Sequence, residues 1–228
     1  MMLDTSVLIL NTDRPVRESA EKLRGYMGKQ FPEYTLLHHH TENGFLCTYP
    51  KVQYKVIEGT PLMLGIEEGA KILKDISSDI KKLELGNEMY TVSGRQINET
   101  GTEVSPKRNY YKYRFITPWF ALNQKNYPKF REMENWKEKD QFLNSILIGN
   151  ILSMCKGLGI IVNHRLNVHS HLKQESGEFK NISFITFTGD FTINFKIPDY
   201  FGLGKNASHG YGTVKDITRM SRCYEYMG

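Results

Sequence analysis

Cysteine is scarce in this chain of 228 residues, which holds three: Cys47, Cys155 and Cys223. They are widely separated and form no CxxC pair, so the sequence indicates neither a disulfide framework nor a structural zinc site. No uninterrupted apolar run approaches the roughly 18 residues of a membrane-spanning helix. The first residues also lack the basic and apolar regions of a secretory signal. We therefore expect no membrane partner and a reducing, cytoplasmic compartment.

Charge of one sign does not dominate the chain either. Thirty Lys and Arg residues against 25 Asp and Glu residues give a net charge of +5. This mild positive excess permits a polyanionic partner such as nucleic acid without requiring one. The 13 tyrosines add side chains that can stack on bases as well as pack in a core.

The first hundred residues alternate between strand and helix patterns. Apolar or β-prone segments predict strands, and stripes of apolar residues three or four apart predict helices. The predicted strands are 6–10, 34–40, 52–57, 62–66, 82–85 and 89–92, and the predicted helices start near Pro15 and Ala70. Asn43-Gly44 signals a hairpin. The order is close to the β-α-β-β-α-β unit of a ferredoxin-like domain.

The second half repeats this order after a polar, turn-rich segment, residues 93–108. That segment predicts a domain boundary near residue 100 or, alternatively, a long hairpin. Beyond it we predict a strand at 111–119, a helix at 142–155, a strand at 160–168, a loop at 174–180 and strands at 182–187 and 191–197, with a bulge at Gly189. The sequence thus predicts an α+β protein with two tandem ferredoxin-like domains, residues 1–100 and 101–228.

The most unusual segment is the glycine-rich stretch GLGKNASHGYG at residues 202–212. Its four glycines would bring bare backbone N–H groups close to a neighbouring molecule, which suits phosphate. A Walker A loop is excluded because Asp199 and Asn206 replace the required Gly and Ser/Thr. Too few residues follow for a dinucleotide-binding unit. A polyanion-binding loop and a surface loop without a ligand both remain open.

Three consecutive histidines, His38, His39 and His40, form a second candidate. On a strand, His38 and His40 would point to one face and His39 to the other. Two imidazoles on one face can divide the acid and base steps of phosphodiester cleavage, because the ordinary histidine pKa lies near 6.5. A metal site would need a third ligand, which the neighbouring positions do not supply. A solvated histidine cluster is the plain alternative.

Three further polar groups also have a plain interpretation as solvated faces. On a strand, Lys51, Gln53 and Lys55 share one side, which favours a cationic face over an apolar underside. A basic cluster beside several tyrosines and a set of histidines near one strand are expected to be exposed side chains. The basic cluster is Lys107, Arg108, Lys112 and Arg114 beside Tyr110, Tyr111 and Tyr113. The histidines are His164, His169 and His171, of which the last two are in phase.

Several of these segments together resemble a known family. They are PKVQYK (50–55), GIEEG (65–69), TPWFALN (117–123), IGNIL (148–152) and GLGKNASHGYGTV (202–214). They resemble the CRISPR-associated endoribonucleases that cut precursor CRISPR RNA inside its repeats, a branch of the RAMP superfamily with its glycine-rich, RNA-binding loop. The resemblance extends from about residue 36 to residue 214.

The resemblance implies two ferredoxin-like domains, RNA as substrate, no cofactor and a cut without a metal. The 2′-hydroxyl would attack the adjacent phosphate and leave a 2′,3′-cyclic phosphate and a 5′-hydroxyl. It also implies a catalytic histidine after the first helix, where this chain has its histidine run. We take His40 as the general acid/base and His38 as its partner. Tyr49 would orient the reacting groups and Lys51 would stabilise charge on the phosphorane.

For RNA binding we expect Lys55 and the loop residues Gly202, Gly204, Lys205, Ser208, His209, Gly210, Tyr211 and Gly212. Many relatives carry Arg where this chain has His209. Further partners to test are a second copy of the chain, as a homodimer, and a CRISPR effector complex. The alternative functions are a non-catalytic RNA-binding subunit of such a complex, which needs no histidine pair, and a metal-dependent hydrolase.

Overall fold

The computed structural model describes residues 1–37, 40–41, 44–45, 49–179 and 182–219. The chain divides into two compact units. The N-terminal unit consists of residues 2–102 together with 207–210, and the C-terminal unit of residue 1, residues 103–206 and the chain from residue 211. No helix within the described ranges is both long and apolar enough to cross a membrane.

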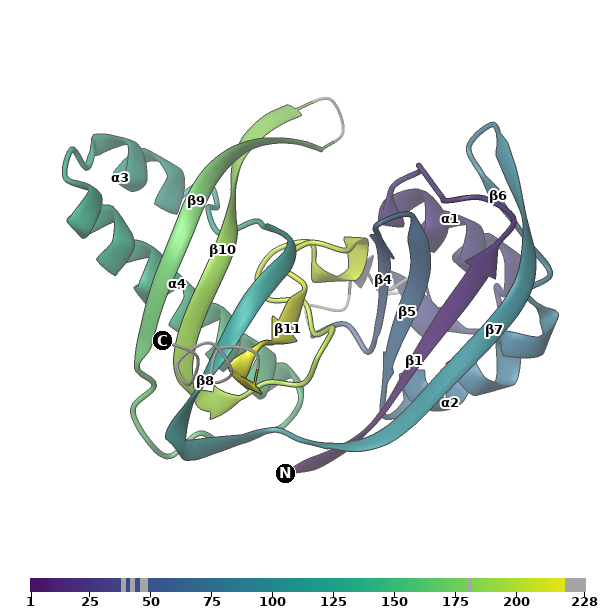
Figure 1. The fold of residues 1–228 in the computed structure, drawn as a ribbon, viewed down its shortest axis with the longest axis horizontal. Helices are drawn as coiled ribbons and strands as arrows, with labels where there is room; N and C mark the ends of the chain where they lie inside the picture. The colour runs from purple at the N-terminus through teal and green to yellow at the C-terminus, as the bar shows by residue number, and fades with distance from the viewer. Residues whose placement is uncertain (38–39, 42–43, 46–48, 180–181, 220–228) are drawn as a thin grey trace. The chain divides into compact units, whose positions relative to one another are not determined.

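The N-terminal unit is a five-stranded sheet with two helices, as Figure 1 shows. Its strands lie in the order β4-β5-β1-β7-β6. Along the chain the main elements follow as β1, α1, β4, β5, α2 and β7, with a small hairpin before β4 and strand β6 before β7. The elements are β1 (Met2–Thr12), α1 (Ala20–Gln30), β4 (Val52–Ile57), β5 (Thr60–Ile66), α2 (Glu68–Ile76), β6 (Lys82–Leu85) and β7 (Glu88–Glu103). This is the ferredoxin-like connectivity that the sequence predicted.

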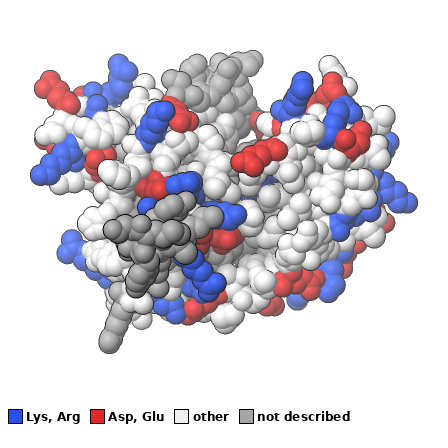
Figure 2. All heavy atoms as spheres, in the orientation of Figure 1, with Lys and Arg blue, Asp and Glu red and all other residues white. Residues whose placement is uncertain are grey.

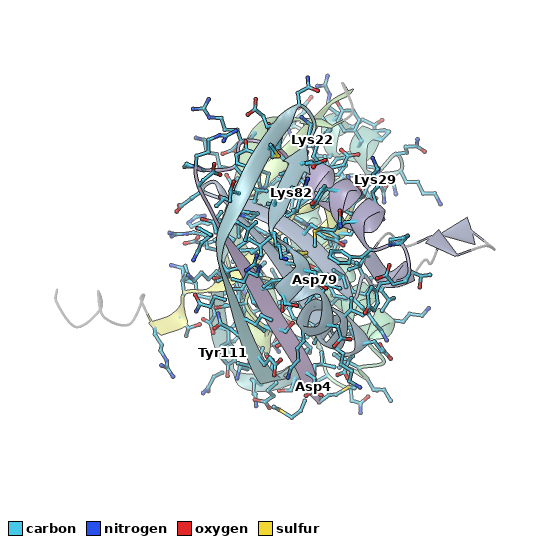
Figure 3. All side chains as sticks on the ribbon, turned by 90° about the vertical axis from the view of Figure 1, so that its right-hand side faces the viewer. Asp4, Lys22, Lys29, Asp79, Lys82 and Tyr111 are labelled. Carbon is cyan, nitrogen blue, oxygen red and sulfur yellow. The ribbon has the colours of Figure 1, made fainter. Side chains whose placement is uncertain are left out.

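Both helices of this unit cover the same face of the sheet. In Figure 3 both helices lie on the same side of the strands, with Lys22 and Lys29 on α1 and Asp79 just after α2. Buried apolar side chains of α1, α2 and the strands form one core cluster, including Leu8, Leu23, Met27, Tyr54, Met63, Leu73 and Tyr90. Burial of this apolar area is the main force that holds the helices on the sheet.

Helix α1 begins later than the prediction from Pro15. Ser19 is the N-cap residue, and its Oγ accepts a hydrogen bond from the backbone N–H of Lys22. Val16 is buried before the helix starts, and its backbone N–H donates to the carbonyl of Gly59 at 2.8 Å. This long-range bond holds the chain in a loop up to Ser19, so the predicted start was wrong although the predicted end near residue 30 is confirmed.

The C-terminal unit has the same topology with one replacement. Its strands lie in the order β11-β8-β10-β9, with α4 between β8 and β9 in the chain. The elements are β8 (Ser105–Trp119), α3 (Asn126–Glu132), α4 (Trp136–Gly157), β9 (Val168–Phe179), β10 (Ile182–Lys196) and β11 (Val214–Asp216). In chain order, the glycine-rich segment with the short 3₁₀ helix η3 (Ala207–His209) stands between β10 and β11, where the ferredoxin-like order would have its second helix. The tandem ferredoxin-like fold is therefore confirmed.

Several predictions for the second half were wrong in detail. Residues 160–167 are not a strand, since β9 starts at Val168. In the predicted loop at 174–180, residues 174–179 are the end of β9, paired with β10, and residue 180 lies outside the described residues. The polar segment 93–108 is also strand, divided between β7 and β8 in two different sheets. Backbone pairing requires no apolar side chains, so these polar strands carry no apolar pattern.

The bulge predicted at Gly189 is confirmed. The register between β10 and β8 shifts at this residue, whose φ is +125°. A Cβ at this position would lie 2.2 Å from the carbonyl oxygen of His171 on β9. Only glycine fits such a close approach of two backbones.

Candidate active site

The segment before the three histidines is anchored to the core of the N-terminal unit. Residues 35–37 form a 3₁₀ turn, η1 (Thr35–Leu37), so the strand predicted at 34–40 was wrong there. Leu37 is fully buried, and its carbonyl accepts a hydrogen bond of 2.9 Å from the hydroxyl of Tyr54 on β4. Because Tyr54 is itself fully buried, the last residue before His38 has a fixed position.

His40 lies at the start of a two-stranded hairpin. Strand β2 (His40–Thr41) pairs antiparallel with β3 (Gly44–Phe45), and His40 lies opposite Phe45. This confirms the hairpin predicted from Asn43-Gly44. His38 and His39 lie outside the described residues, and so does the side chain of His40. The shared face of His38 and His40 therefore stays a prediction.

Tyr49 and Lys51 precede β4 on the other side of this hairpin. Tyr49 is half-buried, and the ammonium of Lys51 forms an ion pair with the Glu68 carboxylate at the start of α2. The hydrogen bond from Lys51 lowers the pKa of Glu68. Exposed ion pairs contribute only about 0–1 kcal/mol. A phosphate could therefore compete with Glu68 for Lys51.

The burial of Lys55 is the clearest difference between the structure and the expectation from the sequence. The cationic face predicted for Lys51, Gln53 and Lys55 would be exposed, but Gln53 and Lys55 are fully buried. The Nζ of Lys55 donates to the Oε1 of Gln53 at 3.1 Å. Burial lowers the pKa of Lys55 to about 7, because the charged form loses its hydration. The expectation of an exposed cation was wrong at this position because both faces of β4 are covered.

Replacing Lys55 by methionine should stabilise the protein near pH 7 and remove part of its pH dependence. The pKa of Lys55 lies near 7 in the folded state and at its ordinary value of 10.5 in the unfolded state. The unfolded state then binds more protons between these values, so the free energy of unfolding rises over that interval. Methionine retains the apolar chain and removes the buried charge.

Denaturant unfolding between pH 6 and 10 tests this prediction. The midpoint should rise with pH for the wild type and much less for Lys55→Met. Lys51→Met, at a partly exposed lysine on the same segment, is the matched control and should retain the wild-type rise. An equal rise in Lys55→Met would show that this lysine keeps its proton on folding.

The backbone N–H groups around the end of the glycine-rich loop bind protein oxygens. Three successive residues donate to carbonyls of the chain: Gly210 to Ala207 at 3.3 Å, Tyr211 to Asn206 at 3.3 Å and Gly212 to Pro118 at 2.8 Å. The predicted cradle of bare N–H groups was therefore wrong at these residues. At these three residues the backbone N–H groups are not available to a phosphate.

The glycines themselves are required for close packing. Gly212 has φ +63°, and a Cβ there would lie 2.1 Å from the carbonyl oxygen of Leu203. Gly204 has φ +82° and lies against Asn150 of α4, whose Oδ1 accepts a hydrogen bond from the Trp119 indole at 3.1 Å. Gly202 is buried and forms an isolated bridge with Thr213. These three glycines belong to the C-terminal unit.

The middle of the loop belongs to the N-terminal unit. Residues 207–210 pack on α1 and β4, where a Cβ on Gly210 would lie 2.9 Å from the Cβ of Ala20 and 3.1 Å from the carbonyl oxygen of Tyr54. Gly210 also lies directly over the backbone of Lys55. The structure thus brings Ser208, His209 and Gly210 to the strand that anchors the histidine segment.

His209 contacts Arg24, a residue that no sequence pattern marked as functional. The Nη1 of Arg24 on α1 lies 2.5 Å from the Nε2 of His209. A guanidinium can only donate, so Nε2 accepts and the imidazole is neutral, with its proton on Nδ1 facing the Ser208 hydroxyl at 3.4 Å. Arg24 is therefore the positive charge at this point. No motif marks it, because the contact spans 185 positions in the chain.

Lys205 and Tyr211 form a second group within the C-terminal unit. The Nζ of Lys205 lies 5.0 Å from the centroid of the Phe120 ring. Tyr211 lies 6.1 Å from Phe120 and 6.0 Å from Phe184, measured between ring centroids. An exposed ammonium beside partly exposed rings can bind a phosphate and a base together.

Metal chemistry has no ready ligand set in the part of the chain that the structure describes. Within those residues, no group of three or more His, Cys, Asp or Glu side chains lies close enough to hold a metal ion. The histidine run itself is not covered by this search.

The chain matches two family models that together extend over nearly all of it. They are the Cas6b N-terminal domain, at residues 1–103, and the Cas6b C-terminal domain, at residues 105–217. A curated relative, an uncharacterized protein of Methanocaldococcus jannaschii, is 39% identical over 142 residues, which are 61% of this chain and 95% of that protein.

Solved structures agree with these matches. A crystal structure of Cas6b is 35% identical, with a TM-score of 0.85, over 95% of this chain and 100% of that chain. A crystal structure of a CRISPR RNA processing endoribonuclease Cas6b is 32% identical, with a TM-score of 0.76 and the same coverage. A CRISPR-associated Cas6 protein at 11% identity shares the fold, with a TM-score of 0.55. With both of its halves matched in order, the chain belongs to the Cas6b family.

Proposed function

We propose that this protein is an endoribonuclease that cuts precursor CRISPR RNA within its repeats without a metal ion. The similarity to a CRISPR RNA processing endoribonuclease Cas6b over 95% of the chain carries this proposal. The hairpin that starts at His40 supports it, because the buried contact between Leu37 and Tyr54 holds the preceding segment in place. We expect the reaction to take place in the cytoplasm.

In the proposed reaction the 2′-hydroxyl loses its proton and its oxygen attacks the adjacent phosphorus. The new O2′–P bond forms as the P–O5′ bond breaks, and the departing 5′-oxygen takes up a proton. His40 serves as the principal acid/base and His38 as its partner, since imidazole can both accept and donate a proton near neutral pH. Tyr49 orients the scissile group, and Lys51 leaves Glu68 to stabilise the phosphorane charge.

The incubation of the purified protein with its own repeat RNA in excess EDTA tests this function. We expect cleavage at one site in the repeat, with a 2′,3′-cyclic phosphate on one product and a 5′-hydroxyl on the other. A strict requirement for added Mg²⁺ or Mn²⁺ would contradict the mechanism. Tight binding without any cut would favour the alternative, a non-catalytic RNA-binding subunit.

Light scattering in the same samples tests the predicted homodimer.

Replacing Arg24 by glutamine should weaken RNA binding and reduce its salt dependence. If Arg24 contacts one phosphate, the slope of log affinity against log salt should fall by about 0.7–0.9. His209→Gln keeps a neutral acceptor next to Arg24 and should change the slope much less. Filter binding at four salt concentrations measures both. An unchanged slope in Arg24→Gln would show that this guanidinium does not contact RNA.

A further inference from the structure

The sheet of the C-terminal unit buries one face and exposes the other. Tyr113, Phe191 and Ile193 are buried, and Figure 1 shows α4 behind this sheet. Because side chains alternate along a strand, Lys112 and Arg114 on β8 point to the opposite, open face. Two members of the expected basic cluster, Lys112 and Arg114, share this face with two of the expected exposed histidines, His169 and His171.

Strand register places these side chains in two rows. In the first row, Lys112 on β8 lies opposite Thr192 on β10, which lies opposite His169 on β9. The second row crosses four strands: Lys215 on β11, Arg114 on β8, Asp190 on β10 and His171 on β9. On one face of a strand, neighbouring side chains are two residues apart, so the two rows are separated by roughly 6.8 Å along the strands.

The charge of these rows is positive. Arg114 holds Asp190 with two hydrogen bonds, 2.7 Å and 3.0 Å long, and the Nζ of Lys112 lies 3.7 Å from the same carboxylate. Two lysines and one arginine against one aspartate leave two positive charges among these four side chains. Figure 2 shows Lys and Arg side chains around the place where Figure 1 labels β11.

The members of the rows on β8, β9 and β10 line an open hollow of about 820 Å³. Lys112, Arg114, His169, His171 and Thr192 contribute to its wall, and Asp190 is its only acidic lining residue in the described part of the chain. A hollow of this size with cationic and hydrogen-bonding walls suits the sugar-phosphate backbone of a nucleic acid.

Tyr110 adds an aromatic surface to the end of the first row. Its side chain is 45% exposed, and its ring centroid lies 6.4 Å from that of His169. Exposed rings beside cations bind unstacked bases, which only a single strand offers. A protein interface of this type would instead centre on a desolvated apolar anchor, and the rows contain none.

We infer that this face binds a single-stranded segment of RNA outside the nucleotides that are cut. We call it the basic sheet face, made of Lys112, Arg114, Lys215, His169, His171 and Tyr110. Phosphates lie against Lys112, Arg114 and Lys215, and a base stacks on Tyr110. The inference rests on the proposed function, which supplies RNA as the substrate, but it concerns a separate surface.

A charge-removal experiment tests the phosphate contacts. The variant Lys112→Ala/Lys215→Ala and the control Lys129→Ala/Lys137→Ala, on α3 and α4, lose the same net charge. The probe is repeat RNA with and without a single-stranded flank on each side. For flanked RNA we expect the first variant to bind about tenfold more weakly at low salt, with a salt slope reduced by about 1.4. The control should change less than threefold.

A second experiment tests the stacking contact. Tyr110→Ala should weaken binding of the flanked RNA, Tyr110→Phe should retain it, and Tyr127→Ala is the control at another exposed tyrosine. Replacing the flank bases by abasic linkers should abolish the effect of Tyr110→Ala. With the same linkers, Lys112→Ala/Lys215→Ala should still bind more weakly than the wild type, because the linkers retain the phosphates.

These outcomes are separable from the proposed function. Cleavage of saturated RNA is measured on the same preparations, and the basic sheet face variants should cut at the wild-type rate. A wild-type protein that never cuts repeat RNA refutes the proposed function, whereas the binding comparisons still test the face. Equal losses in the site and control variants, or losses independent of the flank, would overturn the inference and leave the face to another partner, such as an acidic protein.

Discussion

Replacing His40 by alanine should lower the cleavage rate by about 10²–10⁴-fold and leave RNA affinity nearly intact. The imidazole moves a proton in the transition state and carries little of the binding, which rests on Lys and Arg contacts to phosphates. Single-turnover cleavage at saturating protein measures the rate, and filter binding with an uncleavable RNA measures the affinity.

The neighbouring histidines are the controls for His40. His38→Ala should also slow the cut if the two imidazoles share a face, and His39→Ala should matter little, because alternation points it to the other side. Circular dichroism of each variant checks that the hairpin substitution leaves the fold unchanged. A larger effect of His39 than of His38 and His40 together would show that the assumed register is wrong.

Replacing the 2′-hydroxyl at the cut by hydrogen should stop the reaction and preserve binding. That oxygen is the nucleophile of the proposed reaction, and no other group in the mechanism can form the cyclic phosphate. Affinity should hardly change, because the phosphates that the cations contact are all retained. Gel analysis over a time course and filter binding measure the two properties.

The matched control carries the deoxy substitution one nucleotide further downstream. It removes a hydroxyl from the same region without removing the nucleophile, so its cleavage should remain near the unmodified rate. Cleavage of the first deoxy substrate would show that water or another oxygen attacks the phosphorus. The mechanism would then be a hydrolysis, and the cyclic phosphate ends would be absent.

Much of the N-terminal unit follows from local patterns. The predicted strands 52–57 and 82–85 have the bounds of β4 and β6, because alternation and turn residues define a strand within a few positions. The hairpin at Asn43-Gly44 and the bulge at Gly189 follow from the backbone preferences of single residues. The order of these elements, together with the segments shared with the family, was enough to predict the tandem ferredoxin-like fold.

Elements held by distant contacts were predicted poorly. The start of α1 depends on the bond between Val16 and Gly59, 43 positions apart in the chain, which no helix signal near Pro15 reflects. The polar end of β9 is a strand because β10 pairs with it. Hydrogen bonds between backbones are independent of side-chain hydropathy, so a pattern of residues cannot report them.

The sequence by itself determined the fold and the family, and the catalytic role of the histidine run stays a prediction. Only the tertiary structure decided the state of individual charges. Lys55 lies at an alternating position of its strand, as an exposed lysine would. Packing on both faces of β4 nevertheless buries it and lowers its pKa to about 7. Arg24 contacts His209, and parts of two polar clusters that are far apart in the sequence, together with Lys215, form one basic sheet face. Electrostatic energies depend on distance and dielectric surroundings in space, which separation along a chain does not encode.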